Sequence, residues 1–211
     1  MPEPQRMIQP INHMKVGYGY MNKKYVQQRI VVFRDGTAGK HYGADYWSAD
    51  GDTRIWPSCK GIVFATSYNL KNHEDSTFGQ SIVVYYESAY NWRRRRFQPL
   101  LAYYFHLSEI LVEPKEPVTT AKRLGIMGTT GLHSSGVHLH FQLDANVDDP
   151  LALPCINRTT MFHPAKRHTH LDPADFLYTK TSPPDLQTVA SAGEWWQGGG
   201  KRADWTFPIV R

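Results

Sequence analysis

Two histidines one residue apart, His138 and His140, carry the most distinctive chemical signal in the sequence. They stand in the segment Gly128–Leu143, which reads GTTGLHSSGVHLHFQL. In an extended strand successive side chains point to opposite faces, so the two imidazoles share one face and Leu139 and Phe141 share the other. This pattern predicts half of a metal site on a strand whose other face is buried. Alone it is not specific, because paired histidines on strands are more often ordinary surface or core residues.

The other half of such a site stands far upstream, where His41 and Asp45 are four residues apart. Gly39 and Gly43 favour extended or loop structure over a helix here. Zinc accepts imidazole and carboxylate ligands, and catalytic zinc sites typically take three protein ligands and leave the fourth position to water. His41, Asp45 and one later histidine fulfil this count. A third segment, Tyr103–Ser108, adds a histidine directly after three aromatic residues.

Three ordered motifs combine these residues: HYGAD at 41–45, YFHLS at 104–108 and GVHLHF at 136–141. In this order they resemble the lysostaphin-type zinc endopeptidases, the LytM or M23 family, which cuts peptide cross-links in bacterial cell walls. Shorter likenesses lie at 17–20, 61–63, 79–84 and 124–131, so that the resemblance covers about residues 17–150.

The resemblance implies a site with one Zn²⁺ ion held by His41, Asp45 and His140. A water activated by the metal would attack the peptide carbonyl, since bound zinc lowers the pKa of water toward about 7. His106 and His138 are the expected catalytic residues, one as the base and one facing the oxyanion, in an order that the sequence leaves open. Tyr104 is either a substrate-binding residue that assists the oxyanion or an ordinary core tyrosine.

Some positions depart from the family pattern, but none of them is an expected metal ligand. Val137 stands where proline is usual, and Gln142 where glutamate is usual. One additional residue between Gly131 and Gly136 introduces His133, which we expect at the rim of the site.

The resemblance implies peptidoglycan peptides as the substrate, either glycine bridges or D-amino-acid cross-links, and the sequence does not choose between them. The alternative function is a non-catalytic LytM-like component, which binds the wall or belongs to a virion. All five expected site positions are filled, which favours the enzyme.

Short β-branched, aromatic or alternating runs punctuated by glycine and proline predict a mainly β fold without long helices. We expect two antiparallel sheets with a groove between them, as the resemblance also implies. The predicted organisation is an N-terminal arm (1–16), a peptidase domain (17–180, core motifs 41–143) and a Gly/Trp-rich tail (181–211). Insertions are expected near 69–78 and 91–97.

The net charge of +5 and the isoelectric point near 9.1 favour polyanionic surroundings, and an anionic wall fits them as well as nucleic acid does. The run Arg93–Arg96 is either a contact for such a polyanion or a charged hairpin tip held open by repulsion. Charge and four arginines are a weak basis for a nucleic-acid partner, which is therefore not expected. The oligomeric state is not predicted.

Two widely separated cysteines, Cys59 and Cys155, exclude a cysteine zinc cluster and leave open whether they are bonded. No stretch approaches the roughly 20 apolar residues of a membrane span, and the first residues do not form a signal peptide. We expect action on the cell envelope, by an extracellular, periplasmic or phage-associated protein.

A second H-x-H pattern, His168 and His170, is the rival metal site. It lacks an H-x-x-x-D partner motif and a glycine-rich segment before it such as the one that precedes His138, so we interpret it as unrelated to metal binding.

Overall fold

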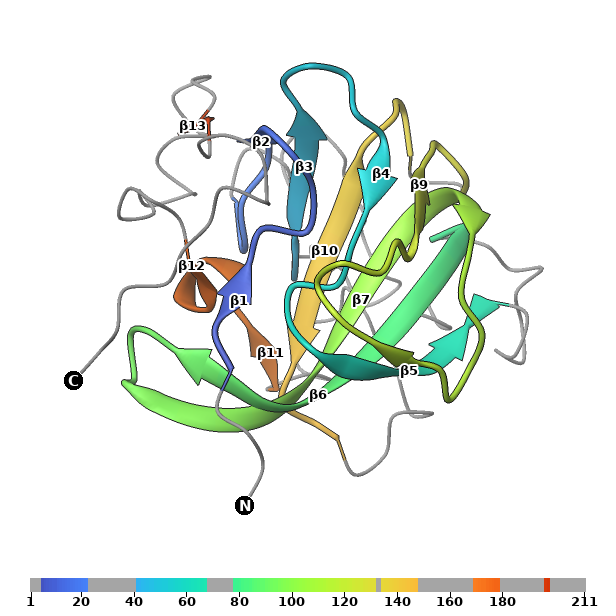
Figure 1. Cartoon of the computed structure of the whole chain (residues 1–211). Coiled ribbons are helices and arrows are strands. Elements are labelled where there is room, and N and C mark those ends of the chain that lie inside the picture. Colours follow the sequence, from blue (N-terminus) through green and yellow to red (C-terminus); the bar gives the residue numbers. More distant parts are fainter. Residues whose placement is uncertain are drawn as a thin grey trace, which may run out of the picture.

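The structure is a computed structural model, and it describes residues 5–22, 41–67, 78–131, 134–147, 169–178 and 196–197. Strands dominate this part of the chain (Figure 1), which confirms the predicted mainly β fold. The predictions on His133, Cys155, His168, residues 69–77 and the tail from 181, apart from 196–197, fall outside the described residues. No helix within the described ranges is long and apolar enough to cross a membrane.

Hydrogen bonds join the strands into one 11-stranded sheet and a separate 2-stranded one. The main path of the large sheet runs β13 (Trp196–Gln197), β2 (Met14–Val16), β3 (Ala44–Ser48), β10 (Leu139–Asp144), β7 (Arg96–Ile110), β6 (Gln80–Asn91), β5 (Gly61–Thr66) and β8 (Pro117–Val118). From it β11 (His170–Leu171) pairs with β10, and β9 (Gly125–Met127) joins β7 to β4 (Arg54–Ile55). All these pairs are antiparallel.

The small sheet consists of β1 (Met7–Ile8) and β12 (Leu177–Tyr178), which pair in parallel. Just before β12 lies a short 3-10 helix, η4 (Pro173–Asp175), where the Asp172 side chain accepts a hydrogen bond from the Ala174 N–H. This cap satisfies one of the donors that a helix start leaves without an internal partner.

Strand β10 shows the alternation that its sequence predicts. Leu139, Phe141 and Leu143 are fully buried in the main core, together with residues of the covering strands β1, β4 and β9 (Figure 1). His140 and Gln142 lie on the opposite face. Burying a Leu or Phe side chain contributes roughly 1.5–3 kcal/mol, and a one-residue slip would turn these side chains away from the core. The apolar face of β10 therefore fixes which face its histidines occupy.

The face that carries His140 has an apolar cluster of its own, which includes Phe78, Val83, Tyr103 and Phe105. The Phe105 ring lies 5.6 Å from the His140 ring, between ring centroids. Strands β6 and β7 are thus buried on both faces, which explains why their sequences read as nearly continuous apolar runs.

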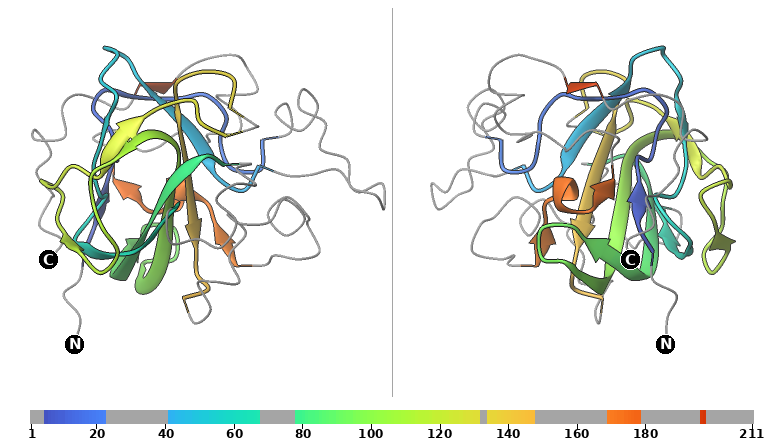
Figure 2. Two further views of the ribbon diagram at one scale, coloured as in Figure 1. Left: turned by 90° about the vertical axis from the view of Figure 1, so that its right-hand side faces the viewer. Right: turned by 60° about the vertical axis from the view of Figure 1, so that its left-hand side comes forward.

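The longest pairing in the sheet is the β6–β7 hairpin, whose strands have 12 and 15 residues. Its register runs from Gln80 opposite Leu107 at one end to Asn91 opposite Arg96 at the turn. The turn lies next to η4, as the right-hand view of Figure 2 shows, and here the Trp92 backbone N–H donates a hydrogen bond to the Asp175 carbonyl. The site described below lies at the other end of β7.

Candidate metal centre and active site

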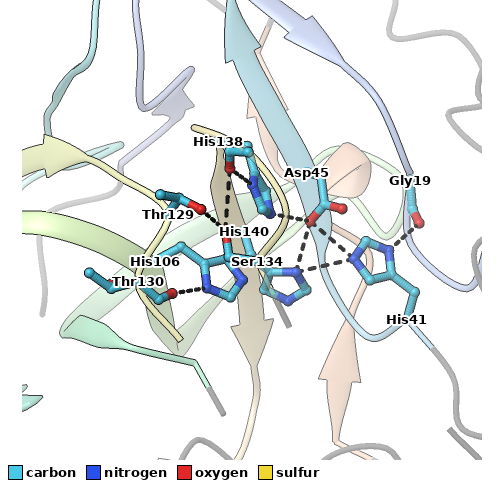
Figure 3. A network of polar contacts seen from close by, with 10 residues as sticks. Gly19, His41, Asp45, His106, Thr129, Thr130, Ser134, His138 and His140 are labelled. Carbon is cyan, nitrogen blue, oxygen red and sulfur yellow. Dashed lines mark hydrogen bonds and ion pairs between the residues drawn. The ribbon is translucent and has the colours of Figure 1, made fainter. Parts of the chain in front are cut away.

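Pairing of β3 with β10 sets Asp45 directly opposite His140. Directly opposite residues share a face of the sheet, so the Asp45 Oδ1 and His140 Nδ1 atoms come within 2.9 Å. His41, three residues before β3, places its Nε2 3.2 Å from Asp45 Oδ1 and 3.1 Å from His140 Nδ1 (Figure 3). All three residues are buried, and their ligand atoms lie within 4.8 Å of one another. We call this group the triad cluster.

Hydrogen bonds outside the triad cluster set the direction of its imidazoles. The His41 Nδ1–H donates to the Gly19 carbonyl at 2.8 Å, which leaves the lone pair of Nε2 facing Asp45. The His140 Nε2, on the far side of its ring, is buried without a hydrogen-bond partner among the described residues. A Cβ on Gly43 would come within 2.5 Å of that atom, so the glycine in HYGAD makes room for the ring.

The donor set of the triad cluster fits a divalent cation. Burial by itself would raise the pKa of Asp45, but the neighbouring His41 and His140 hold it well below its usual value, so the carboxylate is ionised. Burial lowers the pKa of His140 and keeps that ring neutral. Tetrahedral zinc with bonds of about 2.0 Å separates its ligand atoms by about 3.3 Å, close to the distances here. A cation would also compensate the buried carboxylate.

Two further histidines, His106 and His138, face each other beside the triad cluster, with ring centroids 4.8 Å apart (Figure 3). The His138 Nδ1–H donates to the Gly136 carbonyl at 2.7 Å, and its Nε2 lies 3.8 Å from Asp45 Oδ1. His106 Nδ1–H donates to the Thr130 carbonyl at 2.8 Å. Each ring therefore has its Nε2 available for proton transfer.

His106 owes its direction to an irregularity in β7. Its φ of 66° is uncommon for a residue other than glycine, and the pairing with β9 shifts register between Leu107 and Glu109. Burial, together with the neighbouring imidazoles of His138 and His140, lowers the pKa of His106 to about 3. The ring is therefore neutral near pH 7, with an unprotonated Nε2.

Thr130 supports this irregularity, a role that sequence reasoning missed. Besides accepting from His106, it donates from Oγ1 to the Leu107 carbonyl at 2.7 Å and accepts from the Gln80 N–H at 3.0 Å. A Cβ on Gly79 would come within 2.3 Å of Thr130, so the threonine lies tightly against the start of β6. In the sequence Thr130 stands in a Thr-Thr-Gly turn, but the spacing of the turn does not indicate these contacts.

Tyr104 does not lie at the site, which corrects its prediction as a substrate-binding residue. It is fully buried in the main core, where its hydroxyl lies 2.7 Å from that of Tyr86 and accepts from the Ser58 N–H at 3.3 Å. Regular alternation would place Tyr104 and His106 on one face. The positive φ of His106 breaks the alternation, so only the histidine turns toward the site.

His170, from the rival H-x-H pattern, lies on β11 beside β10. The Gln142 Nε2–H donates to its Nδ1 at 3.2 Å, the Asp144 carboxylate lies 3.8 Å from the same atom, and its ring stacks on Tyr42 at 4.4 Å between centroids. His170 is buried and belongs to this neighbouring group, whereas the cluster with three converging ligand atoms consists of His41, Asp45 and His140.

Trp47 is a second residue whose position the sequence did not indicate. It lies on β3 two residues after Asp45, on the same face, and its ring centroid is 5.9 Å from that of His138. Both side chains are partly exposed, so the site meets solvent on this side.

Comparison with known proteins agrees with the motifs. The profile of peptidase family M23 matches residues 39–150, which include all five site residues. The peptidoglycan DD-endopeptidase ShyA of Vibrio cholerae serotype O1 (strain ATCC 39315 / El Tor Inaba N16961) is 32% identical over 103 residues. These residues make up 49% of this chain, but they span only 20% of that relative.

Solved structures share the fold. A chain of the SpoIIQ-SpoIIIAH pore forming complex has a TM-score of 0.53 at 19% identity, covering 90% of this chain and 98% of that chain. The antimicrobial peptidase lysostaphin from Staphylococcus simulans has a TM-score of 0.50 at 20% identity, covering 87% of this chain and 60% of that one. At these identities the likeness concerns the fold alone. The profile match extends over more than half of the sequence, and the chain therefore belongs to peptidase family M23.

Proposed function

We propose that this chain is a zinc-dependent endopeptidase that hydrolyses peptide cross-links or bridges of bacterial peptidoglycan. The observation that carries the proposal is the convergence of three ligand atoms, from His41, Asp45 and His140, beside a pair of histidines with available Nε2 atoms. Membership of family M23 and the relative whose name is peptidoglycan DD-endopeptidase support the substrate class. Action at the cell envelope is part of the same proposal.

In this proposal one Zn²⁺ ion is held by His41 Nε2, Asp45 Oδ1 and His140 Nδ1. Bound zinc supplies Lewis acidity toward a peptide carbonyl and acidifies a water molecule. The Gly19 carbonyl fixes the His41 tautomer that such binding needs. Gly43 has no side chain, which leaves room for the His140 ring against the backbone before β3. The β3–β10 register holds Asp45 opposite His140.

His106 and His138 divide the proton chemistry between them. One Nε2 accepts the proton of the attacking water, and the other ring donates a hydrogen bond to the carbonyl oxygen as negative charge develops there. Since its Nδ1–H is bonded to a backbone carbonyl, the donating ring must carry a second proton on Nε2. Their Nδ1–H bonds, to the Thr130 and Gly136 carbonyls, keep the rings from rotating. His106 is neutral near pH 7 because burial lowers its pKa, so its Nε2 carries a free lone pair.

The test is mass spectrometry of the products released from purified peptidoglycan, with and without a zinc chelator. Two wall types, one with D-amino-acid cross-links and one with glycine bridges, separate the two substrates. Peptides with new termini that disappear with chelator and return with added Zn²⁺ are the expected result. Bound zinc without cleavage of either wall would instead favour the non-catalytic wall-binding or virion role.

A further inference from the structure

The turn of the β6–β7 hairpin carries four consecutive arginines, Arg93–Arg96, which we call the arginine tip. All four are exposed, and the Arg93 side chain is 77% accessible. The tip lies ten residues along β7 from His106, which at 3.3 Å per residue is about 30 Å away from the histidine pair. Its charge therefore does not belong to the site described above.

Among the residues that the structure describes, little negative charge offsets the arginine tip. Arg93 Nη1 lies 3.9 Å from the Asp175 carboxylate, which is at the limit of an ion pair. Burial raises the pKa of that carboxyl group, whereas Arg93 and Arg94 act in the opposite direction. Within the described ranges no ion pair involves Arg94, Arg95 or Arg96. As far as the described part of the chain goes, these three guanidinium groups can accept an anionic partner.

The backbone holds the tip in one defined turn. The Asn91 side chain accepts a hydrogen bond from the Arg94 N–H at 2.7 Å, and Arg95 has a φ of 51°. Glycine or asparagine would adopt this left-handed conformation at lower cost. Arginine stands there although the turn does not favour it, which points to a use for its side chain.

The base of the hairpin is anchored by aromatic residues. The Trp92 Nε1–H donates to the Phe176 carbonyl at 3.0 Å, and the Tyr90 ring packs against both Trp92 and Phe97 at 4.9 and 4.8 Å between centroids. The Arg6 guanidinium lies 5.5 Å from the Trp92 ring and 5.9 Å from the Tyr90 ring. This cation–π contact adds a fifth positive charge beside the tip.

These contacts restrict the kind of partner. Binding of single-stranded nucleic acid usually relies on several aromatic faces that stack on successive bases. Here Tyr90 and Trp92 are engaged by each other and by Arg6, and the exposed Phe97 ring packs against Tyr90. Insertion into a bilayer needs several exposed apolar side chains, and of the described residues in the turn only Phe97 is a large exposed one, at 42%. The tip offers planar guanidinium groups, which match phosphate oxygens in pairs.

We propose that the arginine tip binds a phosphodiester polyanion of the cell envelope, a polyol-phosphate chain, and so holds the domain on the wall. The phosphate specificity follows from the tip itself, and the choice of an envelope polymer rests on the proposed function. Since the tip and the histidine pair lie at opposite ends of β7, the polymer and the peptide substrate can be bound together.

The test is a binding titration of the full chain with poly(glycerol phosphate) at several salt concentrations. This polymer has no peptide bond, so its binding is independent of hydrolysis. The fourfold variant R93Q/R94Q/R95Q/R96Q is compared with K60Q/K115Q/K122Q/R123Q, which removes the same charge from other exposed positions. The expected result is an affinity at least about tenfold lower for the tip variant, with a log–log salt slope smaller by about 3, and a change below about twofold for the control.

Three outcomes would overturn the proposal. Equal losses in the two variants would show that only net charge matters. Tighter binding of single-stranded DNA at equal phosphate concentration would make nucleic acid the partner, and tighter binding of anionic phospholipid vesicles would make it a membrane.

The variant with four lysines in place of the arginines keeps the charge but removes the planar guanidinium groups, which can donate two hydrogen bonds to one phosphate. Weaker polymer binding is expected for this variant. Cleavage of a soluble peptide by the tip variant, compared with the unchanged chain, shows whether the fold is intact.

Discussion

Two buried histidines on neighbouring strands, His140 on β10 and His170 on β11, illustrate what an H-x-H pattern leaves undecided. Both lie near a carboxylate, and both belong to a pattern that could bind metal. His140 faces Asp45 at 2.9 Å and His41 at 3.1 Å, so three ligand atoms converge. His170 accepts from the Gln142 amide at 3.2 Å and stacks on Tyr42.

The difference comes from the partners and their distances. Each position of β10 on the histidine face has its own neighbour, with Asp45 of β3 beside His140 and His170 of β11 beside Asp144. At the first, the carboxylate is within 3.2 Å of two imidazole nitrogens. At the second, it is 3.8 Å from one. We therefore expect the first group to hold metal and the second to stabilise the fold, and substitutions can separate these roles.

The largest effect is expected for His140→Ala. This substitution removes one of three ligand atoms, so the zinc content after dialysis should fall from about one ion per chain to nearly none. Activity on peptidoglycan should fall by about 10³-fold or more, since several kcal/mol of stabilisation depend on the metal. Metal analysis and product release are the measurements. Full zinc occupancy in this variant would remove His140 from the ligand set.

The next largest effect is expected for His106→Ala and His138→Ala, which should retain zinc but lose turnover by about 10²–10⁴-fold, the usual contribution of acid–base catalysis. Neither residue belongs to the triad cluster, so the zinc content should match that of the unchanged chain. If either variant hydrolyses the wall at a near-normal rate, that histidine is not part of the mechanism.

Acid should destabilise the metal-free protein because His106 and Asp45 take up protons less readily in the folded state than in the unfolded chain. His106 has its pKa lowered to about 3 in the folded state against about 6.5 when unfolded, so the unfolded chain binds more protons between these values. The contribution of His106 to the free energy of unfolding is fully present above about pH 6.5 and is lost as the pH falls toward 3. The lowered pKa of Asp45 acts in the same direction below about pH 4.

The measurement is urea unfolding with chelator at pH 7 and pH 4.5, where this histidine alone accounts for a loss of up to about 2–3 kcal/mol. His106→Asn should make the pH dependence shallower, and His13→Asn, on a loop outside the site, serves as the control. An unchanged pH dependence in His106→Asn would assign the acid sensitivity to other groups.

The smallest effect on activity is expected for His170→Ala. Loss of the ring leaves the Gln142 amide and Tyr42 without this neighbour, so the free energy of unfolding should fall by about 1–3 kcal/mol. Zinc content should remain near one ion per chain, and turnover should stay within about threefold. His168→Ala should change neither. Loss of zinc in either variant would mean that the second H-x-H pattern contributes to the metal site.

The sequence predicted the elements that regular alternation governs. The period of β10 separated His140 from Leu139 and Phe141, and the motif order brought Asp45 to the same site. It failed where the backbone departs from regularity. The left-handed φ of His106 reverses the face that alternation predicts, so the His106 ring lies at the site while Tyr104, two residues earlier, lies in the core. The supporting contacts of Thr130 depend on this bulge, so no spacing rule could have indicated them.

Zinc binding by His41, Asp45 and His140 is tested most directly by a crystal structure of the zinc-loaded protein, with anomalous data collected at the zinc edge. We predict one strong peak, about 2.0–2.2 Å from each of His41 Nε2, Asp45 Oδ1 and His140 Nδ1. A peak beside His170 and Asp144, or an empty triad cluster in crystals that hold zinc elsewhere, would show that the triad cluster is not the zinc site.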